Sequence, residues 1–97
     1  MAGVKLRYTR QALADLDEAG TYIALDRPGA AARVAARIQD AIEELRRFPE
    51  IGHPGRVPGT RELVVTGTPF RVAYRVAGNE VSILAILHGA LRWPSGF

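Results

Sequence analysis

The chain of 97 residues contains no cysteine, and it has one lysine and two histidines. The missing cysteines exclude a disulfide framework and a cysteine-ligated zinc site, and they fit a reducing cytoplasm. We therefore expect no metal site and no cofactor. No apolar run approaches the roughly 20 residues that span a bilayer, so we expect no membrane segment. Because the N-terminus lacks the apolar core of a signal peptide, it predicts a mature, cytoplasmic protein.

Recognisable motifs of several enzyme classes are also absent. The sequence has no glycine-rich dinucleotide motif, no phosphate-binding Walker loop and no arrangement of serine, histidine and aspartate that indicates a nucleophilic triad. The polar faces of its amphipathic stretches mix both signs of charge, which does not favour binding to a membrane surface. At 47% hydrophobic residues, the chain has enough apolar material for a small core.

Positive charge is concentrated in the C-terminal half of the chain. Residues 1–50 hold eight basic and eight acidic residues, whereas residues 51–97 carry the whole net charge of +3. Twelve of the thirteen basic residues are arginine, whose planar guanidinium group suits a carboxylate or a phosphate. A GC-rich genome would also favour arginine and alanine codons. The composition therefore leaves a functional and a genomic explanation of the arginines open.

The N-terminal half predicts one strand and two helices. Alternating residues predict a strand over residues 4–8, and Thr9 is expected to cap the helix that follows. The apolar stripe of this first helix is predicted to comprise Leu13, Leu16, Gly20 and Ile23. Its acidic residues are expected to point to water, and they are Asp15, Asp17 and Glu18.

A second helix is predicted to begin near Pro28, because proline is favoured at the first helical position. The linker of about two residues predicts that the helices form an antiparallel hairpin. Prolines and glycines from Pro49 to Gly59 predict an irregular loop. The apolar stripe predicted for the second helix comprises Ala31, Val34, Ile38, Ala41, Ile42, Leu45 and Phe48.

Three further strands are predicted over residues 61–65, 70–76 and 81–87, separated by tight turns. The last strand is apolar on both faces, which indicates an interior position in the sheet, next to residues 4–8. In the middle strand one face is expected to meet the helices and the other to carry arginines. The first face comprises Phe70, Val72, Tyr74 and Val76, and the second comprises Arg71, Ala73 and Arg75.

These elements predict an α+β fold of the order β-α-α-β-β-β, as a single domain over residues 1–97. The helical hairpin is expected to cover one face of a four-stranded, mostly antiparallel sheet. The predicted order of the strands in the sheet is 61–65, 70–76, 81–87 and 4–8.

This order of elements, together with several short motifs, resembles the RelE/ParE superfamily of toxins from bacterial type II toxin–antitoxin systems. The resemblance covers nearly the whole chain, and its motifs are Arg61-Glu62-Leu63, Tyr74-Arg75-Val76, Leu87-His88-Gly89-Ala90, Trp93-Pro94, residues 10–16 and residues 48–52. It implies a small cytoplasmic, growth-inhibiting toxin of a plasmid-stabilisation type. Such a toxin would be neutralised in a hetero-oligomer by a cognate antitoxin.

The superfamily has branches with different targets. RelE-like members cut mRNA in the ribosomal A site, whereas ParE-like members poison DNA gyrase. RelE-like enzymes often use a pair of lysines and a late tyrosine, but Lys5 is the only lysine here and no tyrosine follows Tyr74. This departure favours the ParE-like branch and DNA gyrase as the target. The alternatives are a ribosome-dependent mRNA endonuclease and an inactive remnant that only binds its antitoxin.

If the chain were RelE-like, the candidate catalytic residues would be Arg61, Arg75 and His88. The arginines would hold the scissile phosphate, and His88 would act as base or acid because histidine titrates near neutrality. The alternative for His88 is a structural hydrogen bond to the backbone. Glu62 is either a second titrating group or the ion-pair partner of an arginine.

The candidate residues for binding an antitoxin or a target are Arg71, Arg75, Arg92 and Trp93. Arg71 and Arg75 would bind carboxylates or phosphates, and the alternative is a solvated face with weak ion pairs. Arg92 and Trp93 are typical interface anchors, although Trp93 would equally serve as a lid over the core. An apolar helical segment of the antitoxin would need the groove beside the helical hairpin.

Overall fold

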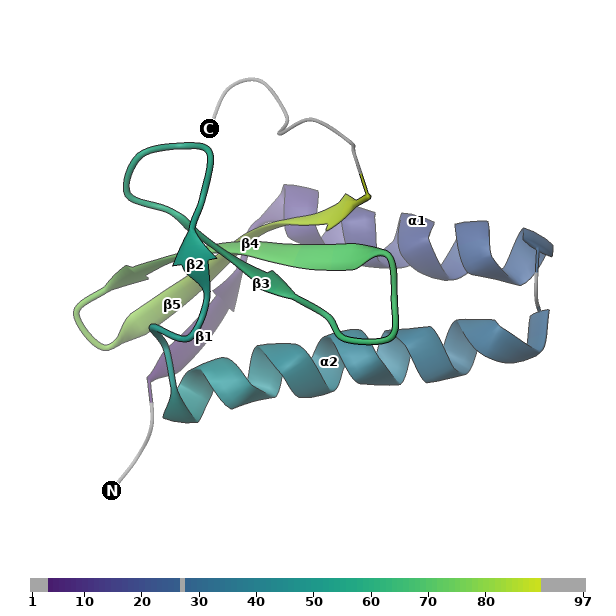
Figure 1. The fold of residues 1–97 in the computed structure, drawn as a ribbon, viewed down its shortest axis with the longest axis horizontal. Helices are drawn as coiled ribbons and strands as arrows, with labels where there is room; N and C mark the ends of the chain where they lie inside the picture. Colours follow the sequence, from purple (N-terminus) through teal and green to yellow (C-terminus); the bar gives the residue numbers. More distant parts are fainter. Residues whose placement is uncertain (1–3, 27, 90–97) are drawn as a thin grey trace.

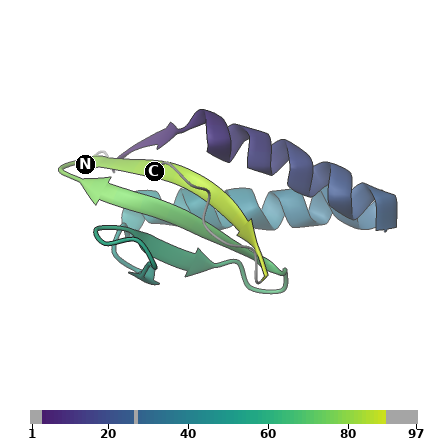
Figure 2. The same cartoon turned by 90° about the horizontal axis from the view of Figure 1, so that it is seen from above.

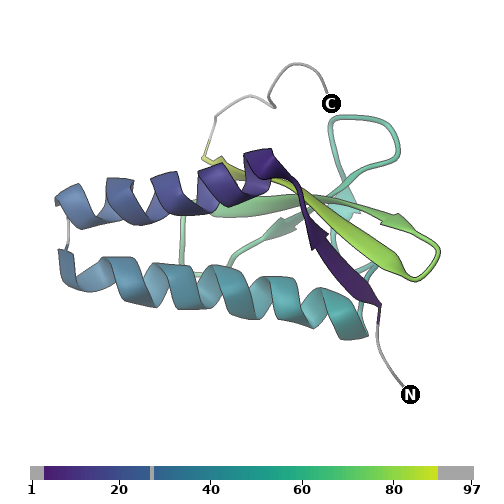
Figure 3. The ribbon, with the colours of Figure 1, turned by 180° about the vertical axis from the view of Figure 1, so that it is seen from behind.

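The computed structural model of the chain describes residues 4–26 and 28–89, without the side chains of residues 20–28. Two helices lie on one face of a mixed sheet (Figures 1 and 3). The described elements are β1 (Lys5–Tyr8), α1 (Arg10–Asp26), the 3-10 turn η1 (Pro28–Ala30), α2 (Ala31–Arg47), β2 (His53–Pro54), β3 (Arg61–Val64), β4 (Phe70–Ala77) and β5 (Glu80–His88).

The sheet has five strands in the order β1-β5-β4-β3-β2, and β1 runs parallel to β5 while the other pairs are antiparallel. The four strands and their predicted order are confirmed, including the interior position of β5. The prediction of a four-stranded sheet is wrong in one respect. The loop that follows α2 adds a short edge strand, β2, which pairs with β3 only at His53↔Glu62 and Pro54↔Arg61. Proline is tolerated there because an edge strand leaves one side of its backbone unpaired.

Thr9 caps α1 as predicted, and it also joins the helix to the sheet. Its hydroxyl accepts a hydrogen bond from the amide of Ala12 at 3.0 Å and donates one to the carbonyl of Leu84 at 2.9 Å. Asp15 was expected to point to water, and this is wrong. Its Oδ2 accepts a hydrogen bond from the amide of Ile86 at 2.9 Å. Since β1 ends at the level of Ile83, these two side chains occupy backbone groups of β5 that a longer β1 would have paired.

The buried stripe of α1 differs from the prediction, which was wrong for Leu13 and did not include Ala12 and Ala19. Ala12 and Ala19 are buried and Leu16 is partly buried, whereas Leu13 is 55% exposed. The predicted members Gly20 and Ile23 lie outside the residues whose side chains are described. A small alanine faces the sheet in place of leucine, because the start of α1 is held close to β5 by the Thr9 and Asp15 hydrogen bonds.

The second helix packs its predicted stripe against the sheet. Ile38, Ile42 and Leu45 are fully or almost fully buried, and Val34 and Ala41 are partly buried. Phe48 follows the helix end and is 49% exposed, so its assignment to the stripe is wrong. The two helices run antiparallel, and their connected ends project past the sheet (Figures 1 and 2). No described helix has the length and hydrophobicity that a bilayer crossing requires.

The predicted helix-facing side of β4 forms the centre of the core. Phe70, Val72 and Tyr74 are buried there, and Val76 packs against the same cluster at its edge. A bulge between Ala73 and Tyr74 shifts the register against β5. The assigned faces are kept across this bulge, because the extra residue lies on β5 and not on β4.

Candidate functional site

The sheet face that is turned away from the helices, here called the open face, carries Arg71, Ala73 and Arg75 of β4. Only part of it is polar. Ala73, Ala85 and Leu87 form a small buried cluster on this face. Glu62 of β3 lies opposite Ala73 in the register and is 2% exposed. The open face is therefore a packed surface that contains a buried carboxylate, and most of it is not covered by solvated guanidinium groups.

Arg71 is held by contacts within the chain. Its Nη1 lies 3.3 Å from Glu62 Oε1, and its Nη2 donates a hydrogen bond to the carbonyl of Gly89 at 3.0 Å. The second oxygen of the Glu62 carboxylate accepts a hydrogen bond from the amide of Arg56 at 3.1 Å. The expected ion pair between Glu62 and a neighbouring arginine is confirmed. Because its guanidinium group is already paired, Arg71 is less available to an external anion than the sequence indicates.

Arg75 differs from Arg71 in its surroundings. It lies opposite Ser82 on the open face and is exposed. It forms no ion pair and no hydrogen bond through its side chain with any residue that the structure describes. A guanidinium group in this position can form bidentate contacts with a carboxylate or a phosphate of another molecule without breaking a contact of its own.

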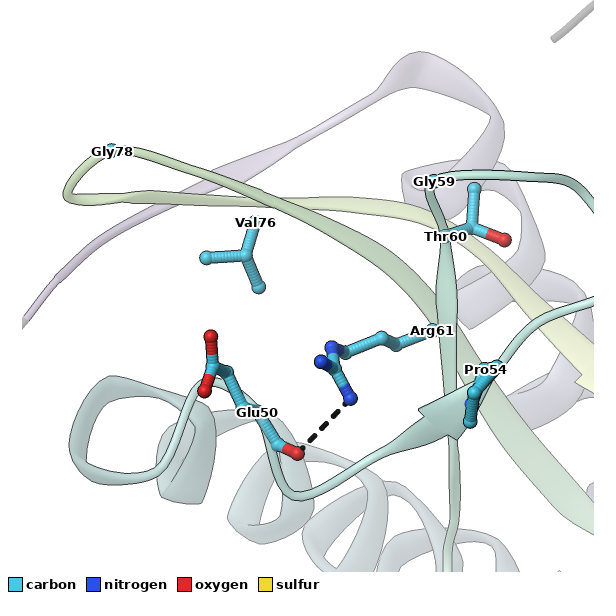
Figure 4. Close-up of a pocket in the computed structure, with 7 residues that line it drawn as sticks. All are labelled: Glu50, Pro54, Gly59, Thr60, Arg61, Val76 and Gly78. Atoms are coloured by element: carbon cyan, nitrogen blue, oxygen red, sulfur yellow. Dashed lines mark hydrogen bonds between the residues drawn. The ribbon is translucent and has the colours of Figure 1, made fainter.

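Arg61 lies on the opposite side of the sheet, because it pairs with Tyr74, whose ring faces the helices. Its Nη1 donates hydrogen bonds to the carbonyls of Gly52 at 2.8 Å and Glu50 at 3.2 Å. Figure 4 shows the guanidinium group directed toward Glu50. These contacts give Arg61 a structural role, since they anchor the segment between α2 and β2.

The Arg61 side chain forms one wall of an open cavity of about 470 Å³. Val76 supplies an apolar wall, and the Glu50 carboxylate lies on the opposite side from the guanidinium group (Figure 4). The remaining lining residues are Pro54, Gly59, Thr60 and Gly78. A cavity that holds one cation and one carboxylate shows no preference for an anionic ligand.

His88 lies at the other end of the β4–β5 hairpin. It pairs with Phe70, and the two rings meet edge to face with their centroids 5.1 Å apart. Phe70 and Tyr74, the cross-strand neighbours of His88 and Arg61, are four residues apart along β4, which corresponds to about 13 Å. The structure therefore does not bring Arg61, Arg75 and His88 together. Arg75 is on the open face, and the other two lie toward the helices at opposite ends.

Tyr74 and Gly52 form a contact that the sequence analysis did not identify. The Tyr74 hydroxyl is buried and accepts a hydrogen bond from the amide of Gly52 at 2.8 Å. A Cβ atom on Gly52 would lie 2.6 Å from that hydroxyl oxygen, so glycine is required for this close approach. Burial raises the pKa of the Tyr74 hydroxyl, so the hydroxyl is neutral at ordinary pH.

Two of the predicted binding residues, Arg92 and Trp93, lie outside the described residues, as do Ala90 and Pro94 of the C-terminal motif. Within residues 4–26 and 28–89, no group of three or more histidine, aspartate and glutamate side chains could hold a metal ion.

Comparison with known families identifies the chain. A family model described as the ParE toxin of the type II toxin–antitoxin system parDE matches residues 6–93. The chain belongs to the ParE toxin family. It is thus a toxin of a type II toxin–antitoxin system, within the RelE/ParE superfamily that the sequence motifs indicated.

Relatives in other bacteria agree with this assignment. The protein Y4kP of Sinorhizobium fredii is 45% identical over 94 residues, which cover 97% of both chains. Toxin RelE2 of Caulobacter vibrioides is 40% identical over 83 residues, covering 86% of this chain and 92% of the relative. The matching family model carries a ParE name and this relative carries a RelE name, so a name alone does not decide the target.

Solved structures show the same fold. The chromosomal ParDE TA system from P. aeruginosa contains a chain that is 31% identical, with a TM-score of 0.81 over 89% of this chain and 96% of that chain. The toxin–antitoxin complex RelBE2 from Mycobacterium tuberculosis contains a chain that is 28% identical, with a TM-score of 0.63 over 89% of this chain and 98% of that chain.

Proposed function

We propose that this ParE-family chain inhibits DNA gyrase by binding it, and that a cognate antitoxin encoded beside it holds it inactive. Binding to an antitoxin is supported by the solved relatives, which are described as a ParDE TA system and a RelBE2 toxin–antitoxin complex. Toxin and antitoxin then form a hetero-oligomer in the cytoplasm, and release of the toxin exposes the surface that meets the target.

The single observation that favours binding over RNA cleavage is the separation of Arg61, Arg75 and His88. Metal-free cleavage of RNA needs a base, an acid and cations that converge within a few ångströms of one phosphate. Arg61 is bonded to the Gly52 and Glu50 carbonyls on the helix side, whereas Arg75 lies on the open face. His88 packs against Phe70 at the far end of the hairpin. A general acid and base are thus not assembled around Arg75.

Arg75 is the residue of the open face that we assign to contact with the target. It is exposed and has no side-chain partner among the described residues, so its guanidinium group is available for an acidic surface. Arg71 has a different role in this proposal, because its ion pair with Glu62 and its bond to Gly89 maintain the open face itself. Arg92 and Trp93 remain candidates for the same interface.

The test is a gyrase supercoiling assay with the purified chain, run in parallel with primer extension on translating ribosomes. We expect inhibition of supercoiling or accumulation of cleaved DNA, without cuts at codon positions. Arg75→Glu should reduce the inhibition at least about tenfold, since reversing one interface charge costs more than losing it. Arg33→Glu on the exposed side of α2 is the matched control and should leave inhibition unchanged.

Codon-position cleavage that disappears in His88→Ala would instead establish a RelE-like endonuclease and refute the gyrase proposal. If overexpression of the chain leaves growth untouched while the antitoxin complex still forms, the chain is a remnant that only binds its antitoxin.

A further inference from the structure

The outer edge of the sheet is only partly covered. Figure 2 shows β3 along this edge, with β2 beside only its first part. The amide of Gly55, next to β2, donates a hydrogen bond to the carbonyl of Thr60, whereas the amide of Val65 donates one to the carbonyl of Phe70 on the β4 side. The N–H and C=O groups of the even-numbered residues of β3 therefore point toward β2, and those of the odd-numbered residues point toward β4. The first residue of β2, His53, lies opposite Glu62. The N–H and C=O groups of Val64, two residues further along β3, therefore have no residue of β2 opposite them.

No described residue pairs with those two backbone groups of Val64. The next carbonyl on the same side, that of Thr66, accepts a hydrogen bond from Arg37 Nη1 at 3.3 Å. The Val64 side chain lies on the open face and is 54% exposed. A sheet edge with an unpaired donor and acceptor beside an exposed apolar side chain is a typical place for an added strand.

The same edge borders a groove of about 380 Å³ between α2 and β3. Ala41 and Leu63 are half-buried in the groove, and they supply apolar surface. Asp40 and Glu44 lie four residues apart on α2, both exposed, and neither forms an ion pair with any described residue. Two like charges at this spacing destabilise a helix slightly. Arg37 also lines the groove, but its Nη1 donates to the Thr66 carbonyl, and it forms no ion pair with either carboxylate. The groove therefore offers its carboxylates to a basic side chain from outside.

We infer that the edge of β3 at Val64 pairs with an extended segment of the antitoxin, and that this segment places a lysine or arginine between Asp40 and Glu44. Side chains of a strand alternate between faces, so the residue beside Val64 is apolar while its neighbours point into the groove. This inference rests on the proposed antitoxin and deepens it, because an antitoxin segment in β conformation, and not only a helical one, would occupy the groove beside the hairpin.

A direct test measures hydrogen exchange at single amides by NMR. The labelled chain is compared alone and in complex with the product of the adjacent gene. The Val64 amide points to solvent in the free chain, and we expect its exchange to slow at least about tenfold in the complex as it gains one backbone hydrogen bond. The amide of Gly78, in the exposed turn at the other end of β4, is the internal control and should exchange at the same rate in both states.

Variants of the edge and the groove give a second measurement, the dissociation constant of the complex. Val64→Pro removes the outward N–H without touching a bond to β4, and we expect about tenfold weaker binding. The double variant Asp40→Lys/Glu44→Lys should weaken binding by a similar factor, about tenfold, through repulsion of the basic residue. Gln39→Lys adds one positive charge to exposed α2 surface outside the groove, and it is expected to bind like the unmodified chain.

The outcomes separate the two proposals. If the adjacent gene product does not bind the unmodified chain, the antitoxin proposal fails and this inference fails with it. If the complex forms but the Val64 amide exchanges at its free rate, only the edge pairing is refuted. Slow exchange at Val64 in the free chain, together with a doubled mass in light scattering, would assign the edge to a second copy of the chain and would also refute the inference. The exchange measurement stands even if Val64→Pro fails to fold.

Discussion

The buried carboxylate of Glu62 allows a quantitative prediction, because its contacts with Arg71 and with the Arg56 amide are defined. Glu62 Oε1 pairs with Arg71 Nη1 at 3.3 Å, and Oε2 accepts the amide of Arg56 at 3.1 Å. The Glu62 side chain is 3% exposed and the Arg71 side chain is 23% exposed. The perturbation is the removal of one charge at a time, by Arg71→Gln and by Glu62→Gln.

The two variants should not cost the same. Arg71→Gln leaves a carboxylate buried without its cation, and removing one member of a buried ion pair typically costs about 3–5 kcal/mol. Glu62→Gln leaves a guanidinium group that is partly exposed and still bonded to the Gly89 carbonyl. Since water screens part of that charge, we expect a cost of about 1–3 kcal/mol. The net contribution of the ion pair to the free energy of unfolding is smaller than the cost of removing either partner, because both charged groups lose hydration when the chain folds.

The assay is urea denaturation followed by circular dichroism, with the free energy of unfolding extrapolated to water. For a domain of this size, each kcal/mol also lowers Tm by roughly 4–8 °C. The matched control is Glu80→Gln, which removes the carboxylate of the exposed ion pair between Arg7 and Glu80, 3.8 Å apart. Exposed pairs contribute little, so the control should unfold within about 0.5 kcal/mol of the unmodified chain.

The reasoning would be refuted by a cost below about 1 kcal/mol for Arg71→Gln, or by a larger cost for Glu62→Gln than for Arg71→Gln. The double variant Glu62→Gln/Arg71→Gln closes the cycle. It removes both charges, so it should be more stable than Arg71→Gln, and a sum of single effects would contradict the proposed coupling.

Three further predictions concern the core and the start of α1. Tyr74→Phe removes the acceptor of the buried Gly52 amide and should cost about 1–3 kcal/mol in urea denaturation. Burial raises the pKa of Tyr74 above its ordinary value, so the hydroxyl loses its proton at a lower pH in the unfolded chain than in the folded one. The contribution of neutral Tyr74 to the free energy of unfolding is therefore constant near neutral pH and decreases as pH rises above about 10. A Tyr74→Phe chain should show a smaller decrease in the free energy of unfolding at alkaline pH. An unchanged decrease would assign the effect to another group, such as Tyr8, because burial also raises the pKa of Tyr8. Gly52→Ala places a methyl group 2.6 Å from the Tyr74 hydroxyl, and we expect a loss of about 1–3 kcal/mol by calorimetry. Thr9→Val should lose about 1–2 kcal/mol, because it removes the helix cap and the bond to Leu84, whereas Thr9→Ser should not.

Periodicity in the sequence was sufficient for the two helices and for four of the five described strands. The alternation of Phe70, Val72, Tyr74 and Val76, and the helical spacing of Ile38, Ile42 and Leu45, each predicted a face that the structure buries. The order of the strands followed from the apolar character of β5 on both faces. These predictions succeed because burial of apolar surface is the dominant driving force, and it leaves a period of two or of 3.6 residues in the chain.

Other features depend on contacts between distant residues, which no local pattern records. The sequence pattern predicts Asp15 to be a surface residue of a helix, yet its carboxylate accepts a hydrogen bond from the amide of Ile86, 71 positions later. The short strand β2 forms because β3 offers an edge to a loop rich in proline and glycine. The Gly52 amide and the Tyr74 hydroxyl meet only after α2 and β4 have packed.

For the candidate site, the sequence by itself determined which residue types are available, and the tertiary structure decided which of them can act. The single lysine and the missing late tyrosine already favour the ParE-like branch in the sequence alone. Only the fold separates Arg71, paired to Glu62, from Arg75, which is exposed and unpaired among the described residues. Both lie on one strand face, and Glu62 on the neighbouring strand, which lies opposite Ala73 between them, pairs with Arg71.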